Sequence, residues 1–370
     1  MIRILHVVAI MNRGGLETMI MNYYRNINRD KVQFDFLVHR NEEGAYDKEI
    51  LSLGGRIYRV PPFNPFHHIT YLRSLDGFFK THGSEYSIVH SHYNSLGAYA
   101  LRYAKKYEVP TRIAHSHNSK YSLDYKIPIF LYSKAILKRY ANTYFACGRE
   151  SGEWLFGKNV QFTIMSNAID ISAFKFNEKY RKEIRQKYGI GDELVIGHVG
   201  RFNKSKNHKY IIEVFEKLSE INPSAKLMFV GSGDSEEVSA RQLVNDLGLA
   251  RSVMFVGNQS EVYKFLSAFD VFIFPSIHEG LPVTLVEAQA SGLPCIVSDT
   301  IPKECKITNL VRFLPIAKHD ISKWVEYISQ IKTDNRSQGK FNGVYDIKVQ
   351  AKVLEKFYTR KTQASDNVHN

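Results

Sequence analysis

Short apolar runs alternate with helix-length segments along almost the whole chain. Each run is rich in β-branched and aromatic residues and is bounded by turn residues, which is the pattern of a buried strand. Strands that alternate with helices pair in parallel and bury both faces of their sheet. The sequence therefore predicts an α/β fold, with strands at 2–10, 32–40, 88–92, 112–117, 143–148, 194–200, 226–231, 253–257, 271–276 and 295–299.

The predicted strands form two series, which meet near residues 167–180. A chain of 370 residues is too long for one ordinary hydrophobic core. We predict two doubly wound, Rossmann-like domains, at 1–170 and 171–345, that face each other across a cleft. In such sheets, ligands bind beyond the carboxyl ends of the strands.

The composition limits the class of partner. The formal charge of +13 favours an anionic partner, such as nucleic acid, an acidic membrane surface or a phosphorylated substrate. No zinc-finger, RNP or helix-turn-helix pattern accompanies the charge, so nucleic acid is not expected. Neither a transmembrane run nor a signal peptide is recognisable, and the three cysteines are widely spaced. These features predict a cytoplasmic protein without disulfides.

The strand at 271–276 leads through a tight turn into a helix that we predict to open at Pro282. Proline suits the first helical position because it lacks an N–H group there. The free N–H groups of Leu281, Val283 and Thr284 would then point out of the helix N-terminus. Such an N-terminus binds anions, and phosphates in particular.

Two glutamates bracket this predicted helix start. Glu287 lies more than a turn into the helix, where a carboxylate can accept hydrogen bonds from a ribose diol. Glu279 lies in the turn itself, next to Gly280. A diphosphate site between a ribose-binding acid and a second, more distal acid describes a nucleotide sugar. The alternative is an ordinary strand–turn–helix connection with two unrelated glutamates.

The whole stretch HEGLPVTLVEAQASGLPCIVSD, at residues 278–299, resembles the donor-site signature of retaining GT-B glycosyltransferases of family 4. Bacterial exopolysaccharide and capsule enzymes are the most similar. The resemblance implies a nucleotide sugar, UDP-linked, as donor and a saccharide or lipid-linked oligosaccharide as acceptor. It also implies that the C-terminal helix, at 346–360, packs back on the first domain.

A polar loop after the strand at 194–200 carries Arg201 and Lys206. Two cations at a cleft can neutralise a diphosphate, although a solvated basic loop is the alternative. The resemblance favours the diphosphate role, and it assigns Asn258 to the nucleobase. The chain contains no Asp-x-Asp triplet, the usual metal holder in other glycosyltransferases. No metal or other cofactor is therefore expected.

In the first domain, Gly14 and Gly15 follow the first strand. They either let the backbone approach the donor closely or form a plain tight turn.

Histidines gather at the ends of two strands, as His90 with His92 and His115 with His117. Alternate spacing in a strand places each pair on one face. Paired imidazoles could bind zinc, but no carboxylate ligand pattern accompanies them. The resemblance points instead to His117 as a cleft histidine that contacts the transferred sugar, with His115 as the alternative.

The function predicted from sequence is retaining transfer of a hexose or N-acetylhexosamine, with His117, Glu279, Arg201 and Lys206 as catalytic residues. Two alternatives stay open: a nucleotide-sugar epimerase of the same fold, and a non-catalytic nucleotide-sugar-binding subunit. A basic, amphipathic segment at 125–141 predicts peripheral contact with the anionic inner face of the cell membrane.

Overall fold

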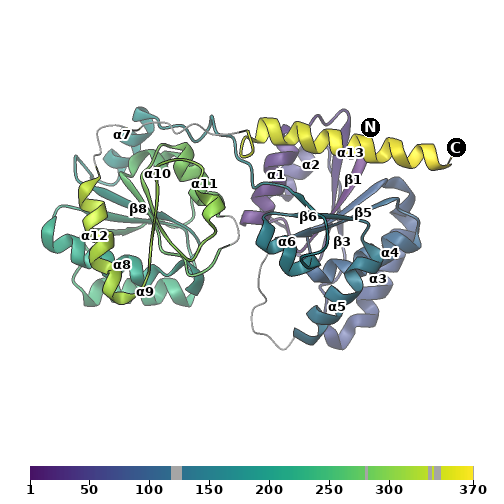
Figure 1. The fold of residues 1–370 in the computed structure, drawn as a ribbon, viewed down its shortest axis with the longest axis horizontal. Helices are drawn as coiled ribbons and strands as arrows, with labels where there is room; N and C mark the ends of the chain where they lie inside the picture. Colours follow the sequence, from purple (N-terminus) through teal and green to yellow (C-terminus); the bar gives the residue numbers. More distant parts are fainter. Residues whose placement is uncertain (118–126, 280–281, 332–335, 337–342, 370) are drawn as a thin grey trace. The chain divides into compact units, whose positions relative to one another are not determined.

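The chain folds into two compact units, which we describe from a computed structural model (Figure 1). The first unit comprises Met1–Ala168 with Ile347–Asn370, and the second comprises Ile169–Asp346. Each is a parallel sheet covered by helices on both faces, so the predicted α/β fold with two Rossmann-like domains is confirmed. The structure describes residues 1–117, 127–279, 282–331, 336 and 343–369.

The sheet of the first unit has the strand order β3-β2-β1-β4-β5-β6-β7, and all neighbours are parallel. Its central strands are apolar and almost fully buried because helices cover both faces. The strands are β1 (Ile2–Val8), β2 (Val32–Val38), β3 (Ile57–Arg59), β4 (Ile88–Ser91), β5 (Thr111–Ser116), β6 (Thr143–Ala146) and β7 (Thr163–Ile164).

One face of this sheet packs against α1 (Gly15–Asn26), α2 (Asp47–Ser52) and α13 (Ile347–His369). The yellow α13 lies along α1 in Figure 1 and buries Ile347, Ala351, Leu354 and Tyr358 in the core of the first unit. This helix starts one residue later than the sequence predicts and continues beyond residue 360. The opposite face packs against α3 (His68–His82), α4 (Gly97–Lys106), α5 (Ile127–Tyr140) and α6 (Arg149–Phe156).

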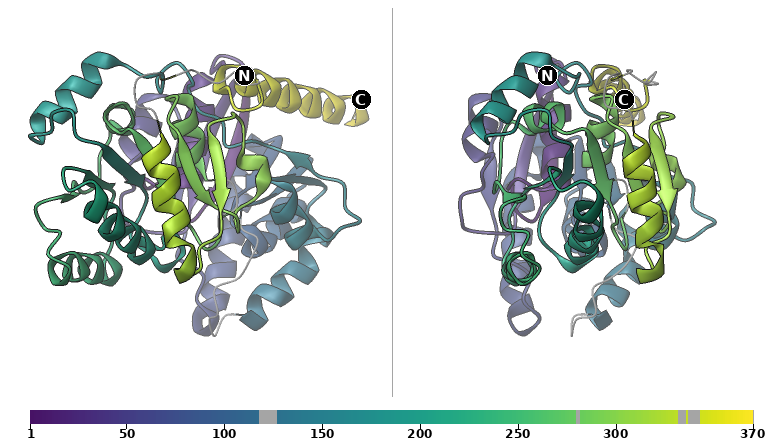
Figure 2. Two further views of the ribbon diagram at one scale, coloured as in Figure 1. Left: turned by 60° about the vertical axis from the view of Figure 1, so that its left-hand side comes forward. Right: turned by 90° about the vertical axis from the view of Figure 1, so that its left-hand side faces the viewer.

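The second unit repeats this topology, with the strand order β10-β9-β8-β11-β12-β13. Figure 2 shows its strands side by side between helices. The strands are β8 (Val195–Val199), β9 (Lys226–Val230), β10 (Val253–Phe255), β11 (Val271–Phe274), β12 (Cys295–Ser298) and β13 (Val311–Leu314).

Two sets of helices cover this second sheet. The first set consists of α8 (His208–Ile221), α9 (Ser235–Asp246) and α12 (Ile321–Gln330). On the opposite face lie α7 (Glu178–Lys187), α10 (Val262–Ala268) and α11 (Val283–Ala290). The three cysteines are free and buried.

All ten predicted strands are present, most of them shortened by one or two residues. The sequence prediction missed β3, β7 and β13, which are edge strands of two to four residues. Such strands bury little surface, so they carry no long apolar run that periodicity could detect.

In each sheet the chain leaves two neighbouring strands toward opposite faces. The connection after β8 leads to α8, whereas the connection after β11 leads to α11 on the other face. The same holds in the first unit for β1, which leads to α1, and β4, which leads to α4. The divergence opens a crevice at the carboxyl ends of these strands, where doubly wound proteins bind ligands.

Candidate functional site

In the second unit, the loop after β8 is hydrogen-bonded to the turn after β11. The Ser205 hydroxyl donates to the backbone carbonyl of His278 over 2.6 Å, and the Ile277 amide donates to the Ser205 carbonyl over 2.8 Å. The Asn207 side chain donates to the Pro275 carbonyl over 3.3 Å. Two segments about 70 residues apart in sequence are thereby fixed together at the crevice.

These contacts bring Lys206 and Glu279 together, two of the residues predicted from sequence. The Lys206 ammonium lies 2.7 Å from a Glu279 carboxylate oxygen, and the two side chains are only 15% and 16% exposed. The same ammonium lies 4.5 Å from the centre of the Phe274 ring. Lysine has three N–H donors, so an ammonium held in this place has donors left for an anionic ligand.

Arg201 lies on the same loop, but its side chain is exposed. Within the described residues, no hydrogen bond or ion pair joins it to Lys206 or Glu279. The turn after β9 lies close to this loop, because the Phe202 amide donates to the Ser232 carbonyl over 3.1 Å and a Cβ on Gly231 would lie 2.1 Å from the Gly200 carbonyl oxygen. Gly231 also has a φ of +138°, which only glycine adopts readily.

The helix after β11 begins at Val283, one residue later than predicted. Pro282 is therefore the N-cap residue and not the first helical residue, since its ψ of 108° is extended. The Pro282 carbonyl accepts the amide of Leu285 over 3.1 Å. The amides of Val283 and Thr284 precede the first helical hydrogen bond and remain available to a ligand. Gly280 and Leu281, also predicted as donor-binding, lie outside the described residues.

Glu287 is buried in this helix, with only 9% of its surface exposed. Burial raises the pKa of its carboxyl group to about 7. In the described chain no side chain or backbone group forms a hydrogen bond with this carboxyl group. A buried carboxyl without partners costs free energy, which a ligand with hydroxyl groups can recover.

Five further buried polar atoms near the crevice have no hydrogen-bond partner among the described residues: His198 Nε2, His208 Nδ1 and Nε2, Ser276 Oγ and Thr284 Oγ1. His198 Nε2 and the Lys206 side chain both lie 3.2–3.3 Å from where a Cβ of Gly200 would be. The sequence analysis missed His198 and Ser276 as site residues. The sequence does carry a signal for each of them. His198 is a polar residue inside the apolar strand β8, and Ser276 is a polar residue just after the apolar strand β11.

Asn258 is exposed and follows β10, the edge strand of the sheet. Two strands separate β10 from β11, so the structure does not bring Asn258 together with Glu279 or Glu287.

In the first unit, Gly14 is the N-cap of α1 and Gly15 its first residue. A Cβ on Gly14 would lie 2.3 Å from a Glu17 carboxylate oxygen, whereas a Cβ on Gly15 would meet nothing within 4 Å. The glycine at position 14 therefore makes room for an acidic side chain in the first turn, where a negative charge stabilises the helix.

A row of stacked histidines spans β1, β4 and β5. The prediction that each His-x-His pair shares one face is confirmed, because the ring centres of His90 and His92 lie 4.2 Å apart and those of His115 and His117 lie 4.0 Å apart. The sequence analysis missed His6 on β1, whose Nδ1 lies 2.9 Å from His92 Nε2. His6 could have been found from the sequence as a histidine inside the first apolar strand.

His115 and His117 differ in how much of the side chain solvent can reach. His115 is 1% exposed, whereas His117 is partly exposed at the carboxyl end of β5. The His117 amide donates to the Asn94 side chain over 3.1 Å, which fixes the backbone there. A ligand can therefore reach His117 more easily than His115.

The histidine row also contains two groups of three rings whose nitrogen atoms lie within 4.8 Å of one another: His6, His90 and His92, and His92, His115 and His117. Neighbouring rings within these groups are only 18–39° from parallel. The lone pairs of an imidazole lie in its ring plane, so near-parallel rings do not aim at one point as tetrahedral zinc requires. This geometry suits hydrogen bonds between rings better than a metal.

Comparison with known proteins agrees with this architecture. Residues 14–158 match a family model described as a glycosyl transferase 4-like domain, and residues 180–342 match one described as glycosyl transferases group 1. A crystal structure of Anabaena HepE with UDP-glucose superposes with a TM-score of 0.75 at 15% identity, over 100% of this chain and 99% of HepE. Fold and family models together define a GT-B glycosyltransferase.

Proteins of similar sequence show to which group of GT-B glycosyltransferases the chain belongs. EpsF, a proposed glycosyltransferase of Bacillus subtilis (strain 168), is 37% identical over 92% of this chain and 90% of its own length. CapH, a capsular polysaccharide biosynthesis glycosyltransferase of Staphylococcus aureus, is 25% identical over 98% and 100%. An Escherichia coli α-1,3-galactosyltransferase, which uses UDP-Gal and GlcNAc-diphosphoundecaprenol, is 24% identical over 90% and 88%. The chain belongs to the family 4 GT-B glycosyltransferases and resembles those of bacterial polysaccharide synthesis.

The buried histidines predict that the first unit loses stability in acid. Burial lowers the pKa of His6 and of His117 from 6.5 to about 3. Between these pH values the unfolded chain binds more protons than the folded chain. The free energy of unfolding should therefore fall as the pH is lowered below about 6.5, by about 1.4 kcal/mol per pH unit for each such ring.

Denaturant unfolding between pH 7.5 and 4.5 measures this slope, and the fluorescence of Trp154 reports the first unit. His6→Phe should reduce the slope by the contribution of one ring. His67→Gln removes an exposed histidine of the same unit and should leave the slope unchanged. Equal slopes for His6→Phe and the wild type would contradict the account.

Proposed function

We propose that the protein transfers a hexose or N-acetylhexosamine, with retention of anomeric configuration, from a UDP-linked sugar to a saccharide or lipid-linked oligosaccharide in surface polysaccharide synthesis. One observation carries the proposal. At the carboxyl ends of β8 and β11, a fixed Lys206–Glu279 pair lies close to the start of a helix that contains the unpartnered Glu287. The cation and the helix N-terminus can bind the diphosphate of a nucleotide, and the buried acid can bind its ribose.

The residues take separate roles in this proposal. Glu287 accepts hydrogen bonds from the ribose hydroxyls, and the amides of Val283 and Thr284 bind the diphosphate with Lys206 and Arg201. Glu279 contacts the transferred sugar, while its ion pair holds Lys206 in place. As the donor bond breaks, negative charge grows on the leaving diphosphate, and fixed cations stabilise it most at that point. His117, at the carboxyl end of β5, is proposed as a residue that contacts the transferred sugar.

The choice of UDP rests on two similar proteins. HepE has been crystallised with UDP and with UDP-glucose, and the Escherichia coli relative uses UDP-Gal. The epimerase and the non-catalytic subunit remain the competing functions. An epimerase would convert a nucleotide sugar without an acceptor, and a binding subunit would release no UDP.

The diphosphate should be neutralised by Arg201 and Lys206 and not by a metal ion. Arg201→Ala and Lys206→Ala should each slow transfer about 10²–10³-fold, or about 3–4 kcal/mol, because each removes a charge that stabilises the leaving group. The measurement is UDP release from UDP-sugars, with acceptor, after exhaustive chelation.

Lys204→Ala provides the control, since Lys204 is an exposed cation on the same loop without a proposed role. Wild-type turnover in the Arg201→Ala, Lys206→Ala double variant would remove both residues from the site. Activity that chelation abolishes and magnesium or manganese restores would show that a metal does this work.

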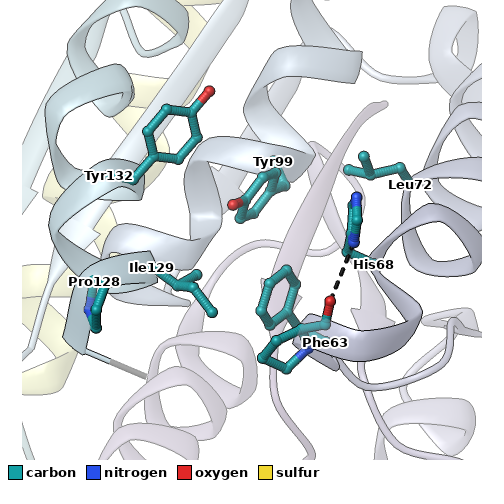
Figure 3. A pocket seen from close by; sticks show the side chains of 8 residues that line it. Phe63, His68, Leu72, Tyr99, Pro128, Ile129 and Tyr132 are labelled. Carbon is teal, nitrogen blue, oxygen red and sulfur yellow. Dashed lines mark hydrogen bonds between the residues drawn. The ribbon is translucent and has the colours of Figure 1, made fainter. Parts of the chain in front are cut away.

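A lipid-linked acceptor has an apolar chain, and the first unit has an apolar pocket of about 290 Å³ (Figure 3). Figure 3 shows Tyr132 and Ile129 of α5 on one side, with Tyr99 of α4 and Leu72 of α3 opposite. Phe66, close in sequence to the lining residues, is 83% exposed. The pocket is lined by Phe63, Pro65, His68, Leu72, Tyr99, Pro128, Ile129 and Tyr132.

The helix α5 lies within the segment predicted to contact a membrane. Part of its apolar face packs on its own unit, since Leu137 is buried and Phe130 half-buried. Leu131 and Tyr132 are 53% and 59% exposed. The described chain has no helix long and apolar enough to span a bilayer. We therefore propose shallow contact through these two side chains and the neighbouring cations, at the cytoplasmic face of the membrane.

This surface should bind anionic bilayers. Replacing Lys134, Lys138 and Arg139 together with glutamate should abolish cosedimentation with anionic liposomes, because each cation near such a surface contributes about 1 kcal/mol. Transfer to a short, water-soluble acceptor should survive, since these residues lie outside the proposed donor site.

A second triple variant controls for net charge. Lys179, Lys182 and Lys187 are exposed on α7 of the second unit, and their replacement with glutamate changes the net charge equally. That variant should still sediment with the liposomes. Wild-type protein that ignores anionic liposomes at low salt would contradict the membrane proposal.

A further inference from the structure

Two separate hydrogen-bonded chains run through the histidine row. In the first, His6 Nδ1 lies 2.9 Å from His92 Nε2, and His92 Nδ1 lies 3.0 Å from His117 Nε2. In the second, the Tyr358 hydroxyl lies 2.7 Å from His90 Nδ1, and His90 Nε2 lies 3.0 Å from His115 Nδ1. Only the first chain ends at the partly exposed His117.

All three rings of the first chain are neutral near pH 7, because burial lowers the pKa of each. A neutral imidazole has one N–H donor and one acceptor nitrogen. The position of one proton therefore dictates the others along the chain. Either every ring carries its proton on Nδ1, or every ring carries it on Nε2.

The two arrangements differ at the buried end of the chain. His6 Nε2 is buried and has no hydrogen-bond partner, and His6 packs between Phe34 and Phe36. With protons on Nε2, His6 would bury an N–H group without an acceptor, which native proteins rarely tolerate. With protons on Nδ1, only a lone pair remains unused there. The arrangement with every proton on Nδ1 is therefore favoured.

We propose that His6 and His92 are positioning residues that hold His117 in the Nδ1–H tautomer. His6 donates to His92, and His92 donates to His117 Nε2. The proton of His117 is then on its remaining nitrogen, which makes this ring a hydrogen-bond donor and not a general base. Resting on the proposed function, this assigns its target as an electron-rich oxygen of the bound substrate.

The proposal is tested first in the unmodified, full-length protein. Nitrogen NMR of histidine-labelled protein distinguishes the two tautomers, and the loss of one signal in His117→Asn assigns His117. We expect the proton on Nδ1 in His6, His92 and His117 alike. A wild-type His117 with its proton on Nε2 would overturn the proposal, and this result needs no variant at position 6 or 92.

Two substitutions of His6 then separate positioning from packing. Methionine cannot donate to His92 Nε2, whereas its sulfur can accept weakly from it. In His6→Met the proton of His92 is therefore no longer held on Nδ1, and a measurable share of His92 and His117 should change to the Nε2–H tautomer. Asparagine retains an amide donor, so His6→Asn should keep the wild-type tautomer. Tyr358→Phe removes an equally buried hydrogen bond from the second chain and should leave His117 unchanged.

The rate of UDP release provides a second test of the same variants. UDP release from UDP-glucose and UDP-N-acetylglucosamine should fall about tenfold in His6→Met, and it should stay near the wild-type rate in His6→Asn and Tyr358→Phe. A folded His6→Met protein with unchanged tautomer and rate would refute the relay. If wild-type protein releases UDP from no UDP-sugar, the proposed function fails, while the NMR result still decides the tautomer.

Discussion

The hydrogen bonds between the loop after β8 and the turn after β11 are the constraint on which the proposed donor site depends. They come from backbone groups and from Ser205 and Asn207, so the geometry does not rely on a ligand. They bring Lys206 to Glu279 at the place where the strand connections diverge. A loop cation fixed in this way loses little conformational freedom when an anion binds, which favours binding and catalysis alike.

Buried polar atoms without partners mark both candidate regions. Among the described residues of the second unit they are His198 Nε2, both ring nitrogens of His208, Ser276 Oγ and Thr284 Oγ1, and the buried carboxyl of Glu287 lies in the same region. In the described part of the first unit they are His6 Nε2, His115 Nε2 and Asp47 Oδ1. Each such atom costs folding free energy, so proteins keep them mainly where a ligand or a mechanism uses them. Asp47 lies on α2 and pairs with Arg59 through its other oxygen, whereas the remaining atoms belong to the histidine row or to the strands and helices next to the crevice.

Much of the fold follows from the sequence because parallel, doubly covered strands are apolar along their whole length. The edge strands β3, β7 and β13 escaped prediction since short, partly exposed strands lack that signal. The turn at 278–287 was predicted from its glutamates and proline, yet the exact helix start was not. Helix ends depend on backbone angles such as the extended ψ of Pro282, which residue type does not determine.

Residues far apart in sequence show the limit of sequence reasoning most clearly. The strand order, which places β1 beside β4, is what brings His6 to His92, and spacing along the chain gives no hint of it. The Lys206–Glu279 ion pair likewise depends on β8 lying beside β11. Motifs identified Lys206 and Glu279 individually, while only the fold shows that they are partners.

Calorimetric titration with UDP tests the central claim most directly, because it probes the nucleotide site without requiring the acceptor. The account predicts that the wild type binds UDP and that Glu287→Ala binds it about 5- to 150-fold more weakly, from ~1–3 kcal/mol of lost hydrogen bonding. Glu220→Ala, an exposed change in the same unit, should bind UDP like the wild type. Absence of UDP binding by the wild type, or equal affinity in Glu287→Ala, would contradict the account.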